Sequence, residues 1–215
     1  MELSSDLAAG IDSECGRPCR TPSRPFATLA WQGCNVEPPV EIRDLGLNEL
    51  SRVGEIDRTE RINVLFEQHG TELVARRRTW NAPAWNPDGP GEHSVDAQDQ
   101  ALVHYASAGG IARGAFSNDR LVGIGVVVPH IRPAIAQLAY LHVGHAFRSA
   151  GIGRRVSVDL ELIASRAGDT EIVVSATPSE NTVRFYLARG YRLMAQPLPE
   201  LLELEAEDIH MRKEF

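Results

Sequence analysis

The chain has 215 residues, of which 43% are hydrophobic, and its formal net charge at pH 7 is -7. This length suits one sizeable core with an extension better than two equal domains. The excess of acidic over basic residues argues against nucleic acid or an anionic membrane surface as the main partner, because proteins that bind either one usually present a positively charged surface. The start of the sequence lacks a signal-peptide pattern and no apolar run has membrane-spanning length, so we expect a cytoplasmic protein.

The beginning of the chain differs in character from the rest. Residues 1–39 mix Gly, Pro, Ser and Arg without helix or strand periodicity, which predicts a poorly ordered extension before a domain over residues 40–215. Cys15, Cys19 and Cys34 all lie in this extension. No nearby histidine and no fourth thiolate completes a zinc site, so we expect free thiols and no metal.

A short strand, a helical segment and a hairpin open the predicted domain. Residues 40–43 suit a strand, and Leu47, Leu50 and Val53 recur three apart, as on one face of a helix. Apolar residues then alternate with polar ones on both sides of a Gly-containing turn, which predicts a β-hairpin over residues 62–79.

A long loop with three prolines follows the hairpin, over residues 80–93. Loops of this length in compact domains are often lids or binding loops. We therefore expect substrate selection to come from the front of the domain: the hairpin, this loop with Trp85, and the segment that holds Glu55, Asp57 and Arg58. The alternative for Trp85 is that it only pins the loop to the core.

Strands and helices then alternate to the end of the chain. The predicted elements are a helix over 95–108 capped by Ser94, two strands joined at 117–119, a strand over 137–143, a helix over 152–167, a strand over 171–176, a helix opening at the capping box Thr177-Pro178-Ser179-Glu180, and strands over 191–194 and 209–213. The nearly continuous apolar strand over 171–176 is typical of a sheet covered on both faces. The acidic stretch between the last two strands predicts a solvated face.

An Arg-x-x-Gly-x-Gly loop, formed by Arg148, Gly151 and Gly153, joins an apolar strand to an amphipathic helix. Small residues let backbone N–H groups converge on an anion, and the start of the helix adds the positive end of its dipole. The pattern predicts a phosphate cradle with Arg148 as a cation beside it. A dinucleotide-binding loop fits less well, because Val156 stands where that motif requires a small residue, and the Gly-Lys-Ser/Thr of a nucleotide-triphosphate loop is missing.

A second motif, Phe-Tyr-x-x-x-Gly-Tyr, runs from Phe185 to Tyr191. With the glycine loop it resembles the GNAT superfamily of acyl-CoA-dependent N-acetyltransferases, strongly over residues 137–194 and in element order back to residue 40. The resemblance implies an α/β (α+β) fold, with a mixed, mostly antiparallel twisted sheet and helices on both faces. It also implies an inserted β-hairpin and loop before the second helical region.

The resemblance implies acetyl-CoA as the acyl donor and no metal. The glycine loop would hold the pyrophosphate, and the backbone of the preceding strand would pair with the pantetheine arm. At the start of the helix that carries the second motif, either Ser179 or Asn181 would bond the pantetheine arm, or both would serve only to cap the helix. The expected cofactor contacts are Leu141, Val143, Arg148, Ser149, Ala150, Gly151, Ile152, Gly153, Ser179 and Asn181.

By the same resemblance, Tyr186 is a catalytic residue that protonates the departing thiolate. A phenol with a reference pKa of about 10 stays protonated at pH 7 and can still share its proton with a thiolate. Many relatives carry a glutamate base where Gln137 stands, and an amide cannot act as a base. We predict His142 as the catalytic base, with Tyr140 or water as the alternatives and a structural role for His142 equally open.

The sequence therefore predicts an N-acetyltransferase that moves an acetyl group from acetyl-CoA to a primary amine by direct attack in a ternary complex. The alternative is a non-catalytic acyl-CoA-binding regulatory module of the same fold, which Gln137 favours and Tyr186 opposes. The expected partner is a small-molecule or peptide amine, with no nucleic acid and no membrane, and a homodimer is left open.

Overall fold

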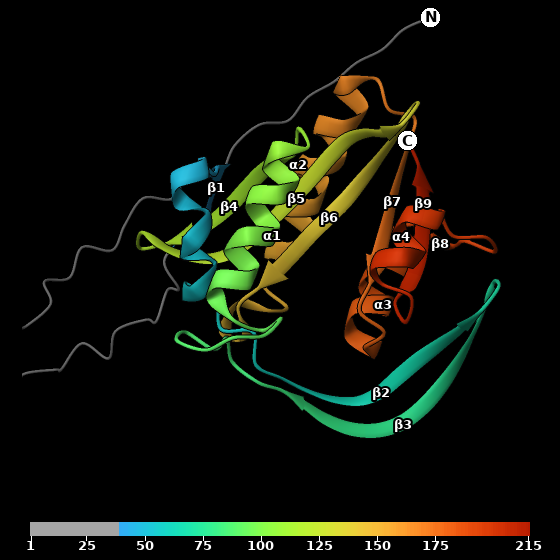
Figure 1. Cartoon of the computed structure of the whole chain (residues 1–215), viewed down its shortest axis with the longest axis horizontal. Coiled ribbons are helices and arrows are strands. Elements are labelled where there is room, and N and C mark those ends of the chain that lie inside the picture. The colour runs from blue at the N-terminus through green and yellow to red at the C-terminus, as the bar shows by residue number, and fades with distance from the viewer. Residues whose placement is uncertain (1–38) are drawn as a thin grey trace, which may run out of the picture. The chain divides into compact units, whose positions relative to one another are not determined.

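The computed structural model describes residues 39–215, which fall within one compact unit, Glu37–Phe215. The predicted extension over residues 1–39, with its three cysteines, lies outside the described residues except for Pro39. The described strands form a seven-stranded sheet and a separate two-stranded hairpin (Figure 1).

The large sheet is mixed and mostly antiparallel. In spatial order its strands are β1 (Glu41–Asp44), β4 (Ile111–Ser117), β5 (Arg120–Arg132), β6 (Ile135–Val143), β7 (Glu171–Ala176), β9 (Ile209–Glu214) and β8 (Arg192–Leu193). Among the strands that the structure describes, only β6 and β7 pair in parallel, as strands joined by a helical crossover do. Their pairing covers just residues 135–137 of β6 and 171–173 of β7, so the rest of β6 keeps one edge without a strand partner among the described residues.

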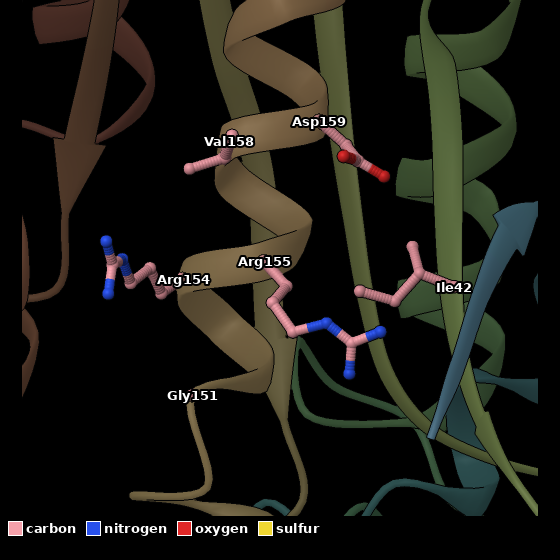
Figure 2. A pocket seen from close by; sticks show the side chains of 6 residues that line it. All are labelled: Ile42, Gly151, Arg154, Arg155, Val158 and Asp159. Carbon is pink, nitrogen blue, oxygen red and sulfur yellow. The ribbon is translucent and has the colours of Figure 1, made fainter. Parts of the chain in front are cut away.

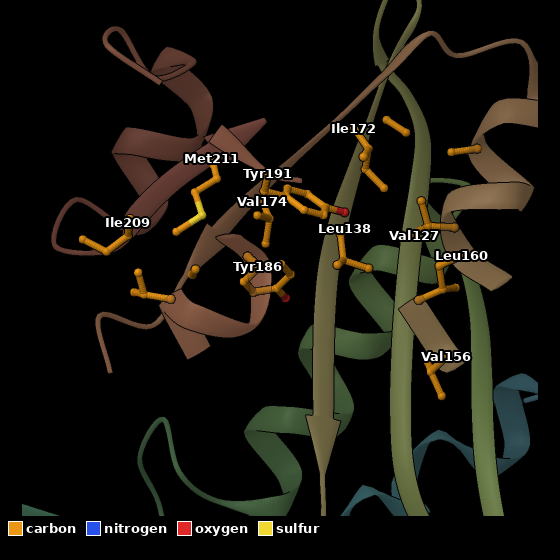
Figure 3. Close-up of a cluster of buried hydrophobic side chains, with 14 of the residues drawn as sticks. Val127, Leu138, Val156, Leu160, Ile172, Val174, Tyr186, Tyr191, Ile209 and Met211 are labelled. Atoms are coloured by element: carbon orange, nitrogen blue, oxygen red, sulfur yellow. The ribbon is translucent and has the colours of Figure 1, made fainter. Parts of the chain in front are cut away.

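Helices cover both faces of this sheet, as predicted. α2 (Ile152–Ala167) and α3 (Glu180–Leu187) pack on one face, and the 3-10 helix η1 (Leu47–Glu55), α1 (Val95–Ser107) and α4 (Pro199–Leu204) pack on the other. The buried side chains on the α2 face include Val127, Leu138, Val156, Leu160, Ile172 and Val174 (Figure 3).

The predicted hairpin is present, with longer strands than expected, as β2 (Glu60–His69) and β3 (Glu72–Ala82). The backbone amide of Phe66 in β2 donates to the carbonyl of Pro178 at 2.8 Å, and the side-chain amide of Gln68 donates to the carbonyl of Met194 at 2.8 Å. The hairpin therefore extends from the end of β6 to the region of α3, β8 and β9 (Figure 1).

The start of α3 corrects the predicted capping box. The box placed Pro178 in the first turn, but the N-cap is Ser179, whose Oγ accepts from the amide of Thr182 at 3.3 Å, and the helix begins at Glu180. Pro178 stays outside the helix because its carbonyl accepts the amide of Phe66. Contact with a distant strand thus overrides a local signal.

The acidic stretch before β9 is also more ordered than predicted, because it contains α4. Leu201 of this helix is buried against Val173 and Met194, whereas Glu203 and Glu207 are exposed. The stretch therefore combines a solvated acidic face with an apolar anchor.

Two negative findings apply to the part of the chain that the structure describes. No helix among residues 39–215 has both the length and the apolar character that a membrane crossing requires. In the same range, no three His, Cys, Asp or Glu side chains are arranged to hold a metal ion.

Candidate active site

The loop between β6 and α2 presents backbone donors at a helix start. After the 3-10 turn η2 (His145–Phe147), Ser149 has a φ of 65° and Gly151 a φ of 76°, and α2 begins at Ile152. No side chain of the described residues caps α2, and the first amides of any helix lack an intrahelical acceptor. A Cβ added to Gly151 would meet no atom of the described residues within 4 Å, so these residues leave the space beside the donors open. The geometry suits an anion.

The side chain of Arg148 turns back from this loop toward β2. Its Nε donates to the carbonyl of Val143 at 3.1 Å, and its guanidinium pairs with Glu60 at 3.0 Å. Glu60 also accepts from the side-chain amide of Asn181 at 2.7 Å. The charge of Arg148 is thus largely compensated, so the backbone donors are the main attraction for an anion. Glu60 links the loop to α3, and nothing in the sequence distinguishes it from an ordinary surface glutamate.

The free edge of β6 presents backbone groups to an extended ligand. The amide of Gly144 donates to the carbonyl of Val122 at 2.8 Å, so these two residues form a hydrogen-bonded pair next to the antiparallel ladder of β5 and β6. Because hydrogen-bonded and non-bonded pairs alternate in an antiparallel ladder, the backbone groups of Leu141 and Val143 point away from β5. One of these, the carbonyl of Val143, accepts the arginine described above. The others face the edge that β7 leaves unpaired.

A β-bulge at Ala139 determines which side chains of β6 face α2 and which face α1. The register with β5 slips at this residue. Beyond the bulge, Leu141 and Val143 pack with the α2 core, while Tyr140 packs with the α1 core and His142 contacts its ring. The two pairs therefore lie on opposite faces of the strand.

His142 lies between two aromatic rings. Its ring centroid is 5.4 Å from that of Trp85 and 4.9 Å from that of Tyr140. Burial, together with the cations Arg58 and Arg148, lowers the pKa of His142 to about 4. The imidazole is therefore neutral at pH 7 and able to accept a proton, although a base with so low a pKa is weaker than an ordinary histidine.

Tyr186 is buried in an aromatic cluster on α3. Its ring centroid is 5.1 Å from those of both Phe185 and Tyr191. Burial raises the pKa of Tyr186, so the phenol keeps its proton throughout the neutral range. Figure 3 shows the hydroxyl end of the ring directed from α3 toward β6. Tyr191, in contrast, donates its hydroxyl to Glu161 at 3.2 Å.

Ser179 and Asn181 stand at the start of α3 in different situations. Ser179 is buried, and its Oγ bonds both the amide and the hydroxyl of Thr182, so this side chain serves the helix start. Asn181 is exposed beside a small pocket of about 70 Å³ that it shares with Glu60 and Asn63. Asn181 is therefore the better placed of the two predicted cofactor contacts.

An open groove of about 600 Å³ adjoins the cradle (Figure 2). Its lining residues are Ile42, Gly151, Arg154, Arg155, Val158 and Asp159. Arg155 donates to the carbonyl of Val40 at 3.1 Å, and Arg154 extends from the other side of α2 (Figure 2). These two arginines follow the glycine loop directly in the sequence, which is the signal by which they could have been predicted as part of the candidate site.

Several solved structures share this architecture. Nourseothricin acetyltransferase matches with a TM-score of 0.60 and 14% identity, over 81% of this chain and 98% of that one. A putative streptothricin acetyltransferase from Bacillus anthracis str. Ames, in complex with acetyl coenzyme A, matches with a TM-score of 0.60 and 16% identity, over 82% and 99%. A putative acetyltransferase of the GNAT family from Desulfovibrio desulfuricans has a TM-score of 0.53 and 15% identity, over 82% and 99%.

No protein-family model and no curated protein matches the chain. The similarity to solved structures is therefore one of fold, and the fold is that of the GNAT acetyltransferases. This confirms the fold that the glycine loop and the Phe-Tyr motif predicted.

Proposed function

We propose that the protein is an N-acetyltransferase that transfers the acetyl group of acetyl-CoA to a primary amine. The observation that carries this proposal is the free edge of β6, which leads directly into the amide donors at the start of α2. Pantetheine has amides that can pair with a strand edge, and a pyrophosphate binds helix-start amides without a metal. The complex of a fold neighbour with acetyl coenzyme A supports the assignment.

The transfer requires the amine nitrogen to attack the thioester carbonyl carbon while the carbon–sulfur bond breaks. The amine loses one proton in this reaction and the departing thiolate gains one. In our proposal, neutral His142 accepts the first proton, directly or through water, and Tyr186 supplies the second. Leu141, Val143 and the loop from Arg148 to Gly153 hold the acyl donor in place.

Release of free thiol from acetyl-CoA upon addition of primary amines tests the proposal. Amine-dependent release supports the transferase, and mass spectrometry of the products identifies the acetylated nitrogen. Tight binding of acetyl-CoA without amine-dependent release would instead indicate a regulatory acyl-CoA-binding module. Gln137 and the lowered pKa of His142 favour that second candidate, because both leave the centre without a strong base.

Replacement of His142 by glutamine should lower kcat by about the same factor, roughly tenfold, at every pH from 6 to 8. The factor is constant because the pKa of His142 is about 4, so the wild-type imidazole is already neutral across this range. Steady-state rates at a series of pH values measure the effect. A variant as fast as the wild type throughout would exclude His142 as the base.

Replacement of Arg154 by alanine should raise the Kd of CoA by about threefold at low salt, and by less at high salt, because the lost contact is an exposed charge interaction. Calorimetry at two ionic strengths measures it. Arg166→Ala is the matched control, since Arg166 is an exposed arginine in the last turn of the same helix. Equal effects of the two substitutions would contradict a role for the groove beside Gly151.

A further inference from the structure

Arg58 holds a positive charge that the described residues do not pair. Its Nη1 atom is buried and has no hydrogen-bond partner within residues 39–215. Burial lowers the pKa of Arg58, and although Glu92 attracts its charge, no carboxylate of the described residues forms an ion pair with Arg58. Arg58 as a whole is half-buried, and a charge that is partly removed from water is stabilised by a counter-charge. The counter-charge for Arg58 is therefore expected from a bound molecule.

A second buried donor lies beside this guanidinium. The Cζ atom of Arg58 is 4.5 Å from the ring centroid of Trp85. Trp85 is only 8% exposed, and its Nε1 atom is buried without a partner among the described residues. Guanidinium and indole nitrogens can only donate hydrogen bonds. Both groups therefore suit a ligand that supplies acceptor oxygens, and the guanidinium additionally favours a negative charge on that ligand.

These donors lie next to the proposed reaction centre. The ring of Trp85 contacts that of His142, which is the residue between Leu141 and Val143 on the free edge of β6. Tyr140 borders the same region, but its hydroxyl is committed to Gln98 at 2.6 Å. We call Arg58, Trp85 and His142 the acceptor cluster. A molecule bound there would lie on the α1 face of the strand whose edge receives the acyl donor.

We propose that the acceptor cluster binds a carboxylate of the acetyl acceptor, so that the acceptor is a small amine that carries a carboxylate, such as an amino acid. The proposal rests on the acetyltransferase function proposed above. A carboxylate offers two acceptor oxygens to the guanidinium fork and the indole N–H. An amine without an acidic group would instead meet the uncompensated charge of Arg58, which disfavours its binding.

Acids matched with their own carboxamides provide the test. We would compare the twenty amino acids with the corresponding amino acid amides, using thiol release from acetyl-CoA by the full chain. We expect the preferred acid to have a KM at least about tenfold below that of its amide, because the charge-assisted pair is lost in the amide. Arg58→Met should abolish this preference, and Arg58→Lys should restore part of it, since lysine keeps the charge without the fork.

A binding measurement separates this inference from the proposed activity. Calorimetric titration of the same acids and amides into the CoA-bound protein does not require turnover. Preferential binding of an acid that disappears in Arg58→Met would support the carboxylate site even if no amine released thiol. Turnover of amides or simple amines as efficient as that of the acids would overturn the inference and leave the acetyltransferase standing. Absence of any acid preference in both measurements would overturn it as well.

Thermal stability distinguishes a ligand-binding arginine from a structural one. Arg58→Met should melt at about the same temperature as the wild type, because it removes a half-buried charge that no carboxylate of the described residues pairs, and methionine retains an apolar side chain beside Trp85. Arg52→Met is the matched control, since Arg52 pairs with Glu55 at 2.7 Å and the control should melt lower without altering acid preference. An Arg58→Met protein that melts lower and retains acid preference would show that Arg58 only supports the fold, against the proposal.

Discussion

Replacement of Tyr186 by phenylalanine should lower turnover at least about tenfold while the affinity for acetyl-CoA remains nearly unchanged, because only the proton donor is removed. The ring that packs against Phe185 and Tyr191 is retained. Burial raises the pKa of Tyr186, so the wild-type hydroxyl is protonated and ready to donate at neutral pH. Steady-state kcat and calorimetric Kd values measure the two effects separately.

Tyr191→Phe is the matched control for this substitution. Tyr191 occupies the same aromatic cluster, but its hydroxyl bonds Glu161, which is also paired with Arg189 and Lys213. The control should lose about 1 kcal/mol of stability, the typical value of one buried hydrogen bond, and keep its turnover. Turnover in Tyr186→Phe equal to that of the wild type would remove this tyrosine from the mechanism.

Replacement of Gly151 by alanine should raise the Kd of acetyl-CoA at least about tenfold, because the added methyl group projects into the open space beside the helix-start amides. No atom of residues 39–215 lies within 4 Å of that position, so the methyl group obstructs a ligand and does not clash with the described fold. The φ of 76° at Gly151 also adds backbone strain of about 1–2 kcal/mol for a residue with a side chain.

Gly168→Ala separates obstruction of the ligand from strain. Gly168 ends the same helix with a φ of 102°, and a Cβ there also meets no atom within 4 Å. Both variants should unfold at lower denaturant concentration, but only Gly151→Ala should bind acetyl-CoA poorly. Equal loss of affinity in both would attribute the effect to stability.

The backbone of the candidate site could be predicted because its signals are local. Gly151 stands where the chain needs a positive φ before a helix, and Arg148 and Gly153 complete a pattern that two apolar elements flank. The alternation of Leu141 and Val143 with His142 likewise follows from strand geometry. Each of these inferences requires only residues that are neighbours along the chain.

The contacts of the side chains could not be predicted, because they depend on segments far apart in the sequence. Glu60 meets Arg148 and Asn181 only after the hairpin has folded across the domain. The sequence places Arg58 on the substrate side of the domain, but it does not show that Arg58 lacks an ion pair. That property depends on where the carboxylates of distant segments lie in the folded chain. The bulge at Ala139 has no sequence signal, since alanine fits a regular strand equally well.

The short parallel pairing between β6 and β7 has a mechanical consequence. Strand pairing joins β1, β4, β5 and β6 to β7, β9 and β8 at these three positions only, so most of the connection between the two groups of strands comes from the side-chain core that they share with α2. The hairpin adds a second connection between the two groups, because Glu60 pairs with Arg148 after β6 and Gln68 bonds the carbonyl of Met194 after β8.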